Sequence, residues 1–456
     1  MRLIESISGI RGIYNNTLNQ DVARRYAYIY NEFLLKRCKK PTVVIGRDTR
    51  DSGEAIHKAV TGVFYKVIDL GIATTPMTEL AVREYNADGG IIITASHNEP
   101  EWNGMKFLDN DGAVLKHKDM TEIICNYNSL RNGFVPDDSN TEIVYMHEDI
   151  ILRYVNFVSG IIGKDNLKTI KNSGIKFIID PNGGAGILSG NVLKGLGIKF
   201  KAVNEQAGVF KRMIEPNEDS LAYLRGMLKR YGCELAFGFD CDADRVGFVH
   251  SNGIVSGHYL LALIVDDLLS DSKSPEQEVV VVNDATSGIV QLVAERHNSR
   301  LVETDVGESN VVESMKKYNS IVGGEGSSSG VIFRGSKCRD GILTMLAVLK
   351  ILAQKKSKIM DILRQYPTFT TLQRTVTINT NSVPKIKARL SSYYRRLGYE
   401  VKIGESIKAI TDNGSFVWFR VSKTENNKMR IVSDSEYKEI AVQLMSEALD
   451  ILNSSI

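Results

Sequence analysis

The stretch Thr42-Val43-Val44-Ile45-Gly46-Arg47-Asp48-Thr49-Arg50 decides the fold class, because a run of β-branched residues passes directly into a polar turn. A helix-like segment then extends to Tyr65, and a second apolar run follows at 66–71. A β-branched run, a turn, an amphipathic segment and a second β-rich run together indicate a βαβ unit.

Two further copies of this pattern lie along the chain, from 176–179 to 198–200 and from 279–282 to 300–304. After about Pro367 the pattern changes to alternation at 372–380, a basic helix-like stretch at 385–397, strands at 415–421 and 429–432, and a helix at 436–452. We therefore predict an α/β protein with three related βαβ-type mixed-sheet domains and a C-terminal α+β domain. The expected domains are residues 1–148, 149–253, 254–366 and 367–456.

Composition excludes several classes of protein. The 456 residues are 43% hydrophobic and 24% charged, which is typical of a soluble globular protein and excludes disordered and collagen-like chains. Lys and Arg total 57 against 54 Asp and Glu, so no whole-chain field attracts nucleic acid or an anionic membrane. Any bound anion is expected to be held by a local cluster.

Location follows from the cysteines and from the apolar runs. The five cysteines form no C-x-x-C pair, which argues against a disulfide framework or a zinc site and fits a reducing cytoplasm. Glu5 interrupts the N-terminus before a signal-like apolar stretch develops. The apolar run at 259–265 is far shorter than the ~20 residues of a membrane span. We expect a cytoplasmic protein that neither crosses a membrane nor binds nucleic acid.

A serine follows one predicted strand. The run 91–93 ends in Thr94-Ala95-Ser96-His97-Asn98, so the Ser96 hydroxyl lies at the carboxyl end of a strand, where open α/β sheets bind ligands. A turn in which Ser96 and Asn98 bond their own backbone is the structural alternative, with His97 as a structural hydrogen-bonding residue. The absence of a G-x-S-x-G motif around Ser96 disfavours an α/β-hydrolase nucleophile.

Three carboxylates follow another predicted strand. In an extended segment Asp240, Asp242 and Asp244 would share one face, with Cys241 and Ala243 pointing away. Like charges placed so close require a cation, and oxygen ligands favour Mg²⁺ over Zn²⁺. A solvated acidic turn is the alternative, which the apolar runs on both sides disfavour.

Two loops suit polar ligands. The glycine-rich segment 323–330 carries Glu325 and Ser327, which suits polyol recognition and equally suits a flexible turn. Arg420-Val421-Ser422-Lys423-Thr424, with Arg430 nearby, offers a guanidinium fork and hydroxyl donors that match a phosphate. An edge strand with alternating basic and hydroxyl residues would look the same, so both readings stay open.

Seven motifs, taken in chain order, resemble those of the α-D-phosphohexomutase superfamily. They are SGIRG at 8–12, GRDTR at 46–50, TASHN at 94–98, NGMK at 103–106, DCDADR at 240–245, GEGS at 324–327 and RVSKT at 420–424. The resemblance covers essentially the whole chain. That family includes phosphoglucomutases, phosphomannomutases and phosphoglucosamine mutases, and the resemblance implies its four domains around a central cleft.

The resemblance also implies roles for individual residues. Ser96 matches the phosphorylated serine, whose phosphate completes a Mg²⁺ shell made by Asp240, Asp242 and Asp244. Lys106 matches the acid/base, and Arg11 and His97 match residues around the phosphoserine. The implied substrate-binding residues are Arg245, Gly307, Glu308, Glu325, Ser327, Arg420, Ser422, Thr424 and Arg430. Among these, Glu325 and Ser327 match the pair that bonds the sugar's C3 and C4 hydroxyls, and the last four match a phosphate clamp.

The implied reaction is reversible phosphoryl transfer between C1 and C6 of glucose and mannose phosphates. It passes through phosphoserine and a hexose 1,6-bisphosphate. The bisphosphate is both the intermediate and the activator, and it turns end for end between the two half-reactions. Glucose and mannose differ at C2, which a pair reading C3 and C4 does not sense. The alternatives are a phosphoglucosamine mutase, a non-catalytic sugar-phosphate binding protein, and a phosphatase.

Several positions depart from the family pattern. Glu99 displaces the proline that normally follows the serine motif to Pro100, and Cys241 stands where a smaller or rigid residue is common. Lys423 and Asn426 alter the phosphate loop, Ser328-Ser329 replaces a Gly-His, and Glu308 ends an altered sugar loop at 304–308. These changes leave the preferred hexose open. The oligomeric state also stays open, with a homodimer as one alternative.

Overall fold

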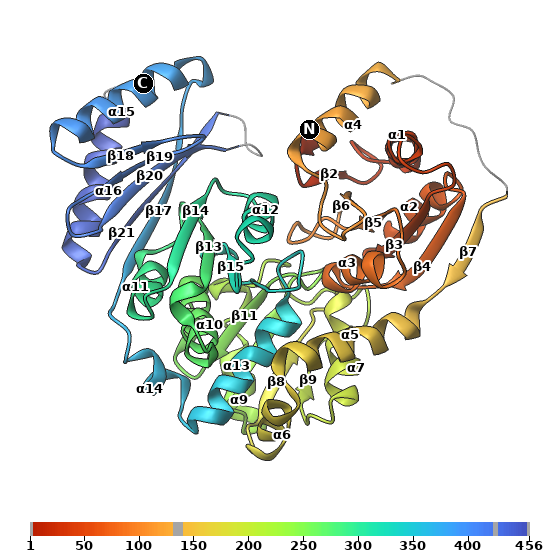
Figure 1. The fold of residues 1–456 in the computed structure, drawn as a ribbon, viewed down its shortest axis with the longest axis horizontal. Coiled ribbons are helices and arrows are strands. Elements are labelled where there is room, and N and C mark those ends of the chain that lie inside the picture. The colour runs from red at the N-terminus through yellow and green to blue at the C-terminus, as the bar shows by residue number, and fades with distance from the viewer. Residues whose placement is uncertain (1–2, 131–139, 423–426, 454–456) are drawn as a thin grey trace. The chain divides into compact units, whose positions relative to one another are not determined.

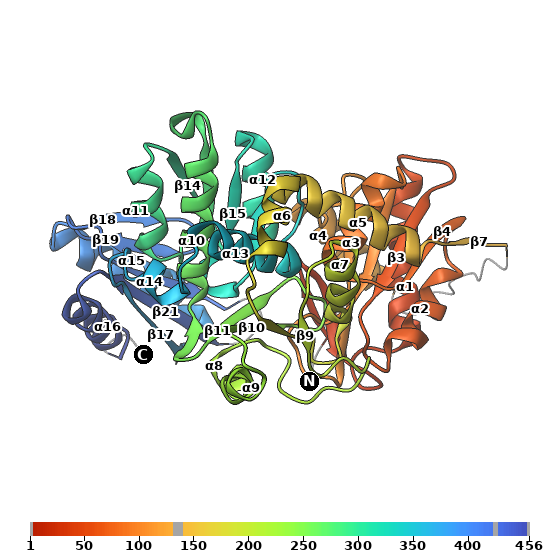
Figure 2. The same cartoon turned by 90° about the horizontal axis from the view of Figure 1, so that it is seen from below.

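Two compact units make up the chain in the computed structural model, which describes residues 3–130, 140–422 and 427–453 (Figures 1 and 2). The first unit contains residues 1–256 and 328–359, and the second contains 257–327 and 360–456. Strands and helices alternate along most of the chain, and four sheets form. The predicted mixed α/β class is confirmed.

The first sheet lies in the first unit, drawn red to orange in Figure 1. Its strands are β1 (Ile4–Ser6), β2 (Gly9–Ile13), β3 (Thr42–Arg47), β4 (Lys66–Ile72), β5 (Gly89–Ile93), β6 (Trp102–Leu108) and β7 (Glu142–Tyr145), in the order β1-β2-β6-β5-β3-β4-β7. Strands β5, β3, β4 and β7 are parallel, whereas β6, β2 and β1 pair antiparallel. Its helices are α1 (Gln20–Leu35), α2 (Gly53–Thr61), α3 (Thr75–Glu84) and α4 (His117–Ser129).

Opposite faces of this sheet carry different helices. Apolar residues of α1, α2 and α4, such as Tyr30, Ile56 and Ile123, form one core with the strands. Helix α3 packs closely on β3 on the opposite face of the sheet. The contact is so close that a Cβ on Gly46 would lie 2.3 Å from Thr78 Oγ1. Helix α3 is therefore held close to the carboxyl end of β3.

The second sheet, also in the first unit, has the order β12-β11-β10-β8-β9. Its strands are β8 (Phe177–Asp180), β9 (Lys201–Ala202), β10 (Leu235–Phe239), β11 (Val246–His250) and β12 (Gly253–Val255). The remaining elements of the unit are α5 (His147–Ile162), α6 (Lys164–Asn172), η1 (Ala185–Ile187), α7 (Leu188–Gly195), α8 (Glu218–Leu221), α9 (Leu224–Tyr231), β16 (Val331–Phe333) and α13 (Gly341–Lys355). Helix α13 is buried along almost its whole length.

One predicted strand is misplaced. We expected a strand at 198–200, but β9 begins at Lys201. The backbone N–H of Ile198 donates to the Leu193 carbonyl oxygen at 2.9 Å and closes the end of α7, and residues 198–200 lead irregularly from the turn at 196–197 into β9.

The second unit contains two sheets with their helices. Strands β13 (Val279–Asn283), β14 (Arg300–Thr304) and β15 (Val322–Gly324) are parallel, with β13 in the middle. The C-terminal sheet is antiparallel, in the order β17 (Thr370–Thr377), β21 (Lys428–Ser435), β20 (Phe416–Val421), β19 (Ile407–Ile410) and β18 (Glu400–Ile403). The helices are α10 (Gly257–Asp271), η2 (Pro275–Gln277), α11 (Gly288–Arg296), α12 (Glu308–Tyr318), η3 (Gly326–Ser328), α14 (Ile359–Leu363), η4 (Thr380–Ser382), α15 (Val383–Arg396) and α16 (Lys438–Asn453).

The two faces of the C-terminal sheet have different character. Helices α15 and α16 cover one face, where residues such as Leu390, Leu444 and Phe419 form a core. Alternate residues of β20 face the other way, so Trp418 and Arg420 are directed away from these helices. The sequence-based analysis did not anticipate β18 and β19.

Polar contacts join this C-terminal sheet to the parallel sheet of the same unit. Asp434 on β21 accepts a hydrogen bond from Thr371 at 2.5 Å and another from the backbone N–H of Gly288 at 2.9 Å. Lys402 donates to Glu303 at 3.1 Å, and Lys408 pairs with the same carboxylate. The two sheets are thus linked at several points.

No helix in the described part of the chain is both long enough and apolar enough to cross a membrane.

Candidate active site

The loop after β5 holds Ser96 in an unusual backbone conformation. Ser96 has a φ of 51°, in the left-handed region that non-glycine residues rarely adopt, and its side chain is buried. Its backbone N–H donates to Thr94 Oγ1 at 2.8 Å, and the Thr94 hydroxyl donates to Asp48 Oδ2 at 2.6 Å. Side chains from two strands therefore hold the loop in place.

The side chain of Arg50 also holds the Ser96 loop in place. The side chain is 1% exposed, and its Nε donates to Asp48 Oδ2 at 3.0 Å. Its two terminal nitrogens donate to the backbone carbonyl oxygens of Ser96 (2.8 Å), Asn98 (2.6 Å), Glu99 (2.5 Å) and Trp102 (3.0 Å). The terminal nitrogens of this buried guanidinium thus bond four carbonyl oxygens of residues 96–102, which gives Arg50 of the GRDTR segment a structural role.

The three aspartates follow β10 and converge, but by a different backbone path from the predicted one. We expected an extended segment, whereas residues 241–244 form a turn in which Ala243 has a φ of 56°. The N–H of Ala243 donates back to the Asp240 carbonyl oxygen at 3.3 Å. One carboxylate oxygen from each of Asp240, Asp242 and Asp244 lies within 4.8 Å of the others. The three carboxylates therefore converge as predicted, but through a turn and not through an extended segment.

Polar groups from several elements meet at this acidic cluster. The Ser96 hydroxyl donates to Asp240 Oδ2 at 3.0 Å. Lys106 on β6 places its Nζ 2.9 Å from Asp242 Oδ2 and 3.3 Å from Asp244 Oδ2. The predicted nucleophile, the predicted acid/base and the carboxylates thus lie in one place.

Two further side chains hold the carboxylates. Thr75, the first residue of α3, donates its hydroxyl to Asp242 Oδ2 at 2.6 Å and its backbone N–H to the Asp242 carbonyl oxygen at 3.0 Å. Arg339 donates to Asp244 Oδ2 at 3.0 Å. The positions of Asp242 and Asp244 are therefore set by groups distant in sequence.

The electrostatics of the cluster favour a cation. Burial and the neighbouring carboxylates Asp244 and Asp242 raise the pKa of Asp240 well above its usual range. Burial would also raise the pKa of Asp244, but the Arg339 and Lys106 cations outweigh it and hold that pKa well below its usual range. Asp244 is therefore held in the ionised form, whereas Asp240 beside it takes up a proton readily unless a cation neutralises the cluster.

The donor set fits a divalent metal ion. Asp242 Oδ1 and Asp244 Oδ1 are buried, and among the described residues neither atom has a hydrogen-bond partner. Asp244 Oδ1 lies 3.8 Å from Arg245 Nε, and buried carboxylate oxygens that accept no hydrogen bond are costly unless a cation binds them. Three carboxylates without nitrogen or sulfur ligands suit a hard ion. The cluster could therefore hold a metal.

Arg11, His97 and Arg245 surround the serine loop. Arg11 on β2 donates to Asn98 Oδ1 at 3.0 Å. Arg245 pairs with Glu215 at 2.7 Å and donates its backbone N–H to Asp240 Oδ1 at 3.1 Å. Burial, followed by the cations Arg245 and Arg11, lowers the pKa of His97 far below its usual value, so the imidazole stays neutral at physiological pH.

The predicted sugar residues lie in the second unit. Glu325 is 8% exposed, and its Oε1 accepts from Asn283 Nδ2 at 3.0 Å and from the Gly307 N–H at 2.9 Å. Glu308 begins α12 directly after Gly307. These bonds fix the Glu325 carboxylate and bring the loops after β13, β14 and β15 together.

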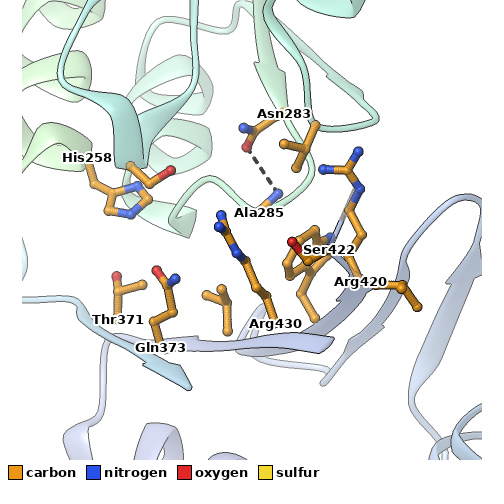
Figure 3. A pocket seen from close by; sticks show the side chains of 13 residues that line it. His258, Asn283, Ala285, Thr371, Gln373, Arg420, Ser422 and Arg430 are labelled. Carbon is orange, nitrogen blue, oxygen red and sulfur yellow. Dashed lines mark hydrogen bonds between the residues drawn. The ribbon is translucent and has the colours of Figure 1, made fainter. Parts of the chain in front are cut away.

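The predicted phosphate residues line a pocket of about 190 Å³ in the same unit (Figure 3). Arg420, Ser422 and Arg430 contribute to its wall, together with Ser327, which was predicted to bind the sugar. Arg420 and Arg430 are directly opposite across β20 and β21, and Arg420 also pairs with Glu405 at 3.3 Å. Figure 3 shows both guanidinium groups rising from the sheet toward the loop that carries Asn283. Thr424 lies outside the described residues.

Comparison with known families identifies the superfamily of the chain. Models described as phosphoglucomutase/phosphomannomutase alpha/beta/alpha domains I, II and III match residues 3–133, 153–253 and 256–369. A phosphoglucomutase/phosphomannomutase of Thermococcus kodakarensis is 31% identical over 97% of this chain and 98% of its own. The chain belongs to the α-D-phosphohexomutase superfamily. The resemblance stated from the motifs is confirmed.

Other relatives within the superfamily have different names. A probable phosphoglucosamine mutase of Pyrococcus horikoshii is 30% identical, with 98% of this chain and 97% of its own covered. Among solved structures, a phosphoglucomutase/phosphomannomutase family protein of Burkholderia thailandensis superposes with a TM-score of 0.85 at 21% identity, covering 99% of this chain and 97% of its own. A putative phosphomannomutase of Thermus thermophilus gives 0.80 at 24% identity, covering 99% of both. The solved structures support the fold.

Sequence reasoning left several contacts of this phosphohexomutase unassigned. Arg50 was quoted only as part of a family motif, and Thr75 and Arg339 had no role. Thr75 meets a carboxylate 167 positions away, which no local pattern reveals. His258 and Gln373, which line the pocket of Figure 3, were also missed because they come from different elements.

Proposed function

We propose that this protein transfers a phosphoryl group reversibly between C1 and C6 of hexose phosphates through a phosphorylated Ser96. The observation that carries the proposal is the Ser96 hydroxyl, 3.0 Å from Asp240 within the carboxylate cluster and beside a lysine. Phosphoryl transfer needs a positioned nucleophile and neutralisation of charge, and this arrangement offers both. A plain binding protein needs neither.

Ser96 carries the phosphoryl group in this proposal. In the first half-reaction the bond between phosphorus and Ser96 Oγ breaks while phosphorus bonds to the free sugar hydroxyl, giving a hexose 1,6-bisphosphate. The bisphosphate turns end for end, and its other phosphoryl group returns to Ser96. The hexose bisphosphate is also the activator that phosphorylates a resting Ser96.

Lys106 exchanges the proton. The uncharged amine takes the proton of the attacking hydroxyl, and the ammonium returns it in the second half-reaction. Its Nζ lies 2.9 Å from Asp242 and 3.3 Å from Asp244, which fixes the position of the amine beside the carboxylates. Arg11 and His97 position the phosphoserine loop, which is consistent with the Arg11 to Asn98 bond at 3.0 Å, and Arg245 is a substrate-binding residue.

Asp240, Asp242 and Asp244 would hold Mg²⁺. The two carboxylate oxygens that have no hydrogen-bond partner in the described chain support this assignment. When bound, the ion supplies neutralisation of negative charge at the transferring phosphoryl group.

The second unit carries the groups that recognise the remainder of the substrate. Glu325 and Ser327 bond the C3 and C4 hydroxyls, with Gly307 and Glu308 supporting their loop. Arg420, Ser422, Arg430 and Thr424 clamp the phosphate that is not reacting. The two guanidinium groups lie opposite each other on neighbouring strands, which supports their joint contact with one anionic phosphate.

Glucose and mannose phosphates are the proposed substrates. Glucose and mannose differ at C2, which the proposed pair Glu325 and Ser327, bonding C3 and C4, does not sense. A phosphoglucosamine mutase remains the second candidate, because several relatives of similar identity carry that name. Five free thiols support a cytoplasmic location.

Two experiments test the proposal. Intact-protein mass after incubation with glucose 1,6-bisphosphate should show one added phosphoryl group in wild type and in Ser251→Ala, a control on an exposed turn, but none in Ser96→Ala. Parallel kinetics with glucose, mannose and glucosamine phosphates identify the sugar. Phosphorylation without turnover of any of them would reject the mutase assignment.

A further inference from the structure

A second pocket lies where strands of the second sheet begin, near Phe177 of β8 and Lys201 of β9. It has a volume of about 500 Å³, inside the range of about 300–1,000 Å³ typical of small-molecule sites. Its apolar wall is made by Ile170, Phe177, Ile198, Phe200, Tyr231 and Leu349. These residues come from α6, β8, the turn before β9, the end of α9 and α13.

This pocket is separate from the carboxylate cluster. Phe177 begins β8 and pairs with Leu235 at the start of β10, whereas Asp240 follows the end of β10. Five residues of extended strand span roughly 16 Å, so the pocket and the cluster occupy opposite ends of the same strands. None of the residues of the proposed mechanism lines it.

Four lysines surround the apolar wall. Lys171, Lys176, Lys199 and Lys201 all line the pocket, and all are exposed. In the described part of the chain no carboxylate pairs with any of their ammonium groups, although Lys201 lies 4.9 Å from the centre of the Tyr231 ring. The lining residues include no aspartate or glutamate.

Four lysines around an apolar pocket, without carboxylate partners in the described chain, favour a ligand that is both anionic and apolar. A hollow with low-dielectric walls concentrates the field of charges at its rim, so an anion is attracted more strongly here than at a flat surface. The aromatic and aliphatic wall contributes burial of an apolar body, at about 25 cal/mol per Å². A ligand that uses both features carries an anionic group at one end of an apolar body.

We propose that this pocket binds a small amphipathic organic anion, with a flat apolar body against Phe200 and Tyr231 and a carboxylate, sulfonate or phosphate among the four lysines. The inference goes beyond the phosphohexose reaction and does not depend on it, since neither the proposed substrates nor their contacts enter it.

The probe that tests the proposal is 8-anilinonaphthalene-1-sulfonate, whose fluorescence rises when its rings leave water. We expect saturable binding that weakens about tenfold or more in Lys176→Glu/Lys201→Glu, since two attractive charges become repulsive. The matched control, Lys118→Glu/Lys194→Glu, makes the same charge change at exposed lysines outside the pocket and should shift Kd less than about twofold. Equal weakening in both double variants would overturn the proposal.

The apolar part has its own test. Ile175→Trp narrows the hollow and should weaken the probe, whereas Ile143→Trp on β7 should not. At constant ionic strength, benzenesulfonate should displace the probe much better than inorganic phosphate or benzyl alcohol does. Displacement by phosphate as effective as by benzenesulfonate would reduce the site to a general basic patch and reject the proposed ligand class.

Cys233 reports the place of binding. This half-buried thiol lines the pocket, whereas Cys125 on α4 is exposed elsewhere in the unit. The probe should slow alkylation of Cys233, measured by peptide mass spectrometry, and leave the alkylation of Cys125 unchanged. Saturable binding without protection of Cys233 would place the probe elsewhere and refute the assignment. Mutase kinetics of the lysine variants, which should be unaltered, separate this outcome from any failure of the proposed function.

Discussion

The hydroxyl of Thr75 offers a sharp test of how the carboxylate cluster is organised. Thr75→Val removes the 2.6 Å bond to Asp242 Oδ2 while keeping the shape of the side chain. The backbone bond from Thr75 N–H to the Asp242 carbonyl oxygen, at 3.0 Å, remains in the variant. The change also removes the weaker 3.4 Å contact in which the Thr75 hydroxyl accepts from Lys106 Nζ, so it tests the hydroxyl as the link between the lysine and the carboxylate.

The expected effect is large for metal binding and moderate for stability. A hydrogen bond to a charged group contributes about 1.5–3 kcal/mol, and residues that orient metal ligands typically affect metal affinity by about 10- to 100-fold. We expect Thr75→Val to weaken Mg²⁺ binding within that range, and Thr75→Ser to restore most of it. Isothermal titration of Mg²⁺ into chelator-treated protein measures both.

The neighbouring threonine supplies a matched control. Thr74 is equally buried, but its hydroxyl accepts from the Met77 N–H at 3.2 Å and caps α3. Thr74→Val should lower the free energy of unfolding by about 1 kcal/mol, through loss of the cap, with Mg²⁺ affinity unchanged. Equal Mg²⁺ affinities in the Thr74 and Thr75 valine variants would refute the reasoning.

Three further predictions concern the proposed mechanism. Ser96→Ala should abolish turnover with little loss of stability, so wild-type kcat in that variant would remove Ser96 from the reaction. Chelator should stop the reaction and Asp242→Asn should raise the Mg²⁺ requirement, because one ligand charge is lost; full activity in excess chelator would exclude the metal assignment. Arg420→Lys keeps the charge but loses the guanidinium fork, so kcat/KM should fall by about ten- to a hundredfold for every hexose phosphate. A loss confined to one sugar would show that Arg420 contacts the ring.

The sequence predicted most of the fold, because the informative patterns were local. The β-branched runs at 42–45 and 279–282 became β3 and β13, since parallel strands buried on both faces require such runs. The short strands β18 and β19 escaped notice, because Lys402 and Lys408 interrupt their apolar pattern with polar side chains that bind Glu303 instead. The strand expected at 198–200 was displaced by the cap that closes α7.

The candidate site was only partly predictable. Asp240, Asp242 and Asp244 were recognisable because they are adjacent in sequence, although the turn at Ala243 that gathers them was not. Arg50, Thr75 and Arg339 act through contacts between elements that only folding brings together, and no periodicity records such contacts. Sequence patterns therefore miss residues whose role depends on contacts with residues distant in the chain.

The links between the parallel sheet and the C-terminal sheet have a consequence for what the second unit can accept. Asp434 and Glu303 join the two sheets, so the gap between the Glu325 carboxylate and the guanidinium groups of Arg420 and Arg430 is set by the protein. A bisphosphate that reverses must present the same reach from ring hydroxyls to outlying phosphate in both poses. Under the proposed function, the second unit would discriminate the distance between the ring and the outlying phosphate more strictly than the configuration at C2. A pentose phosphate, with a shorter arm at one end, would fit it in one pose only.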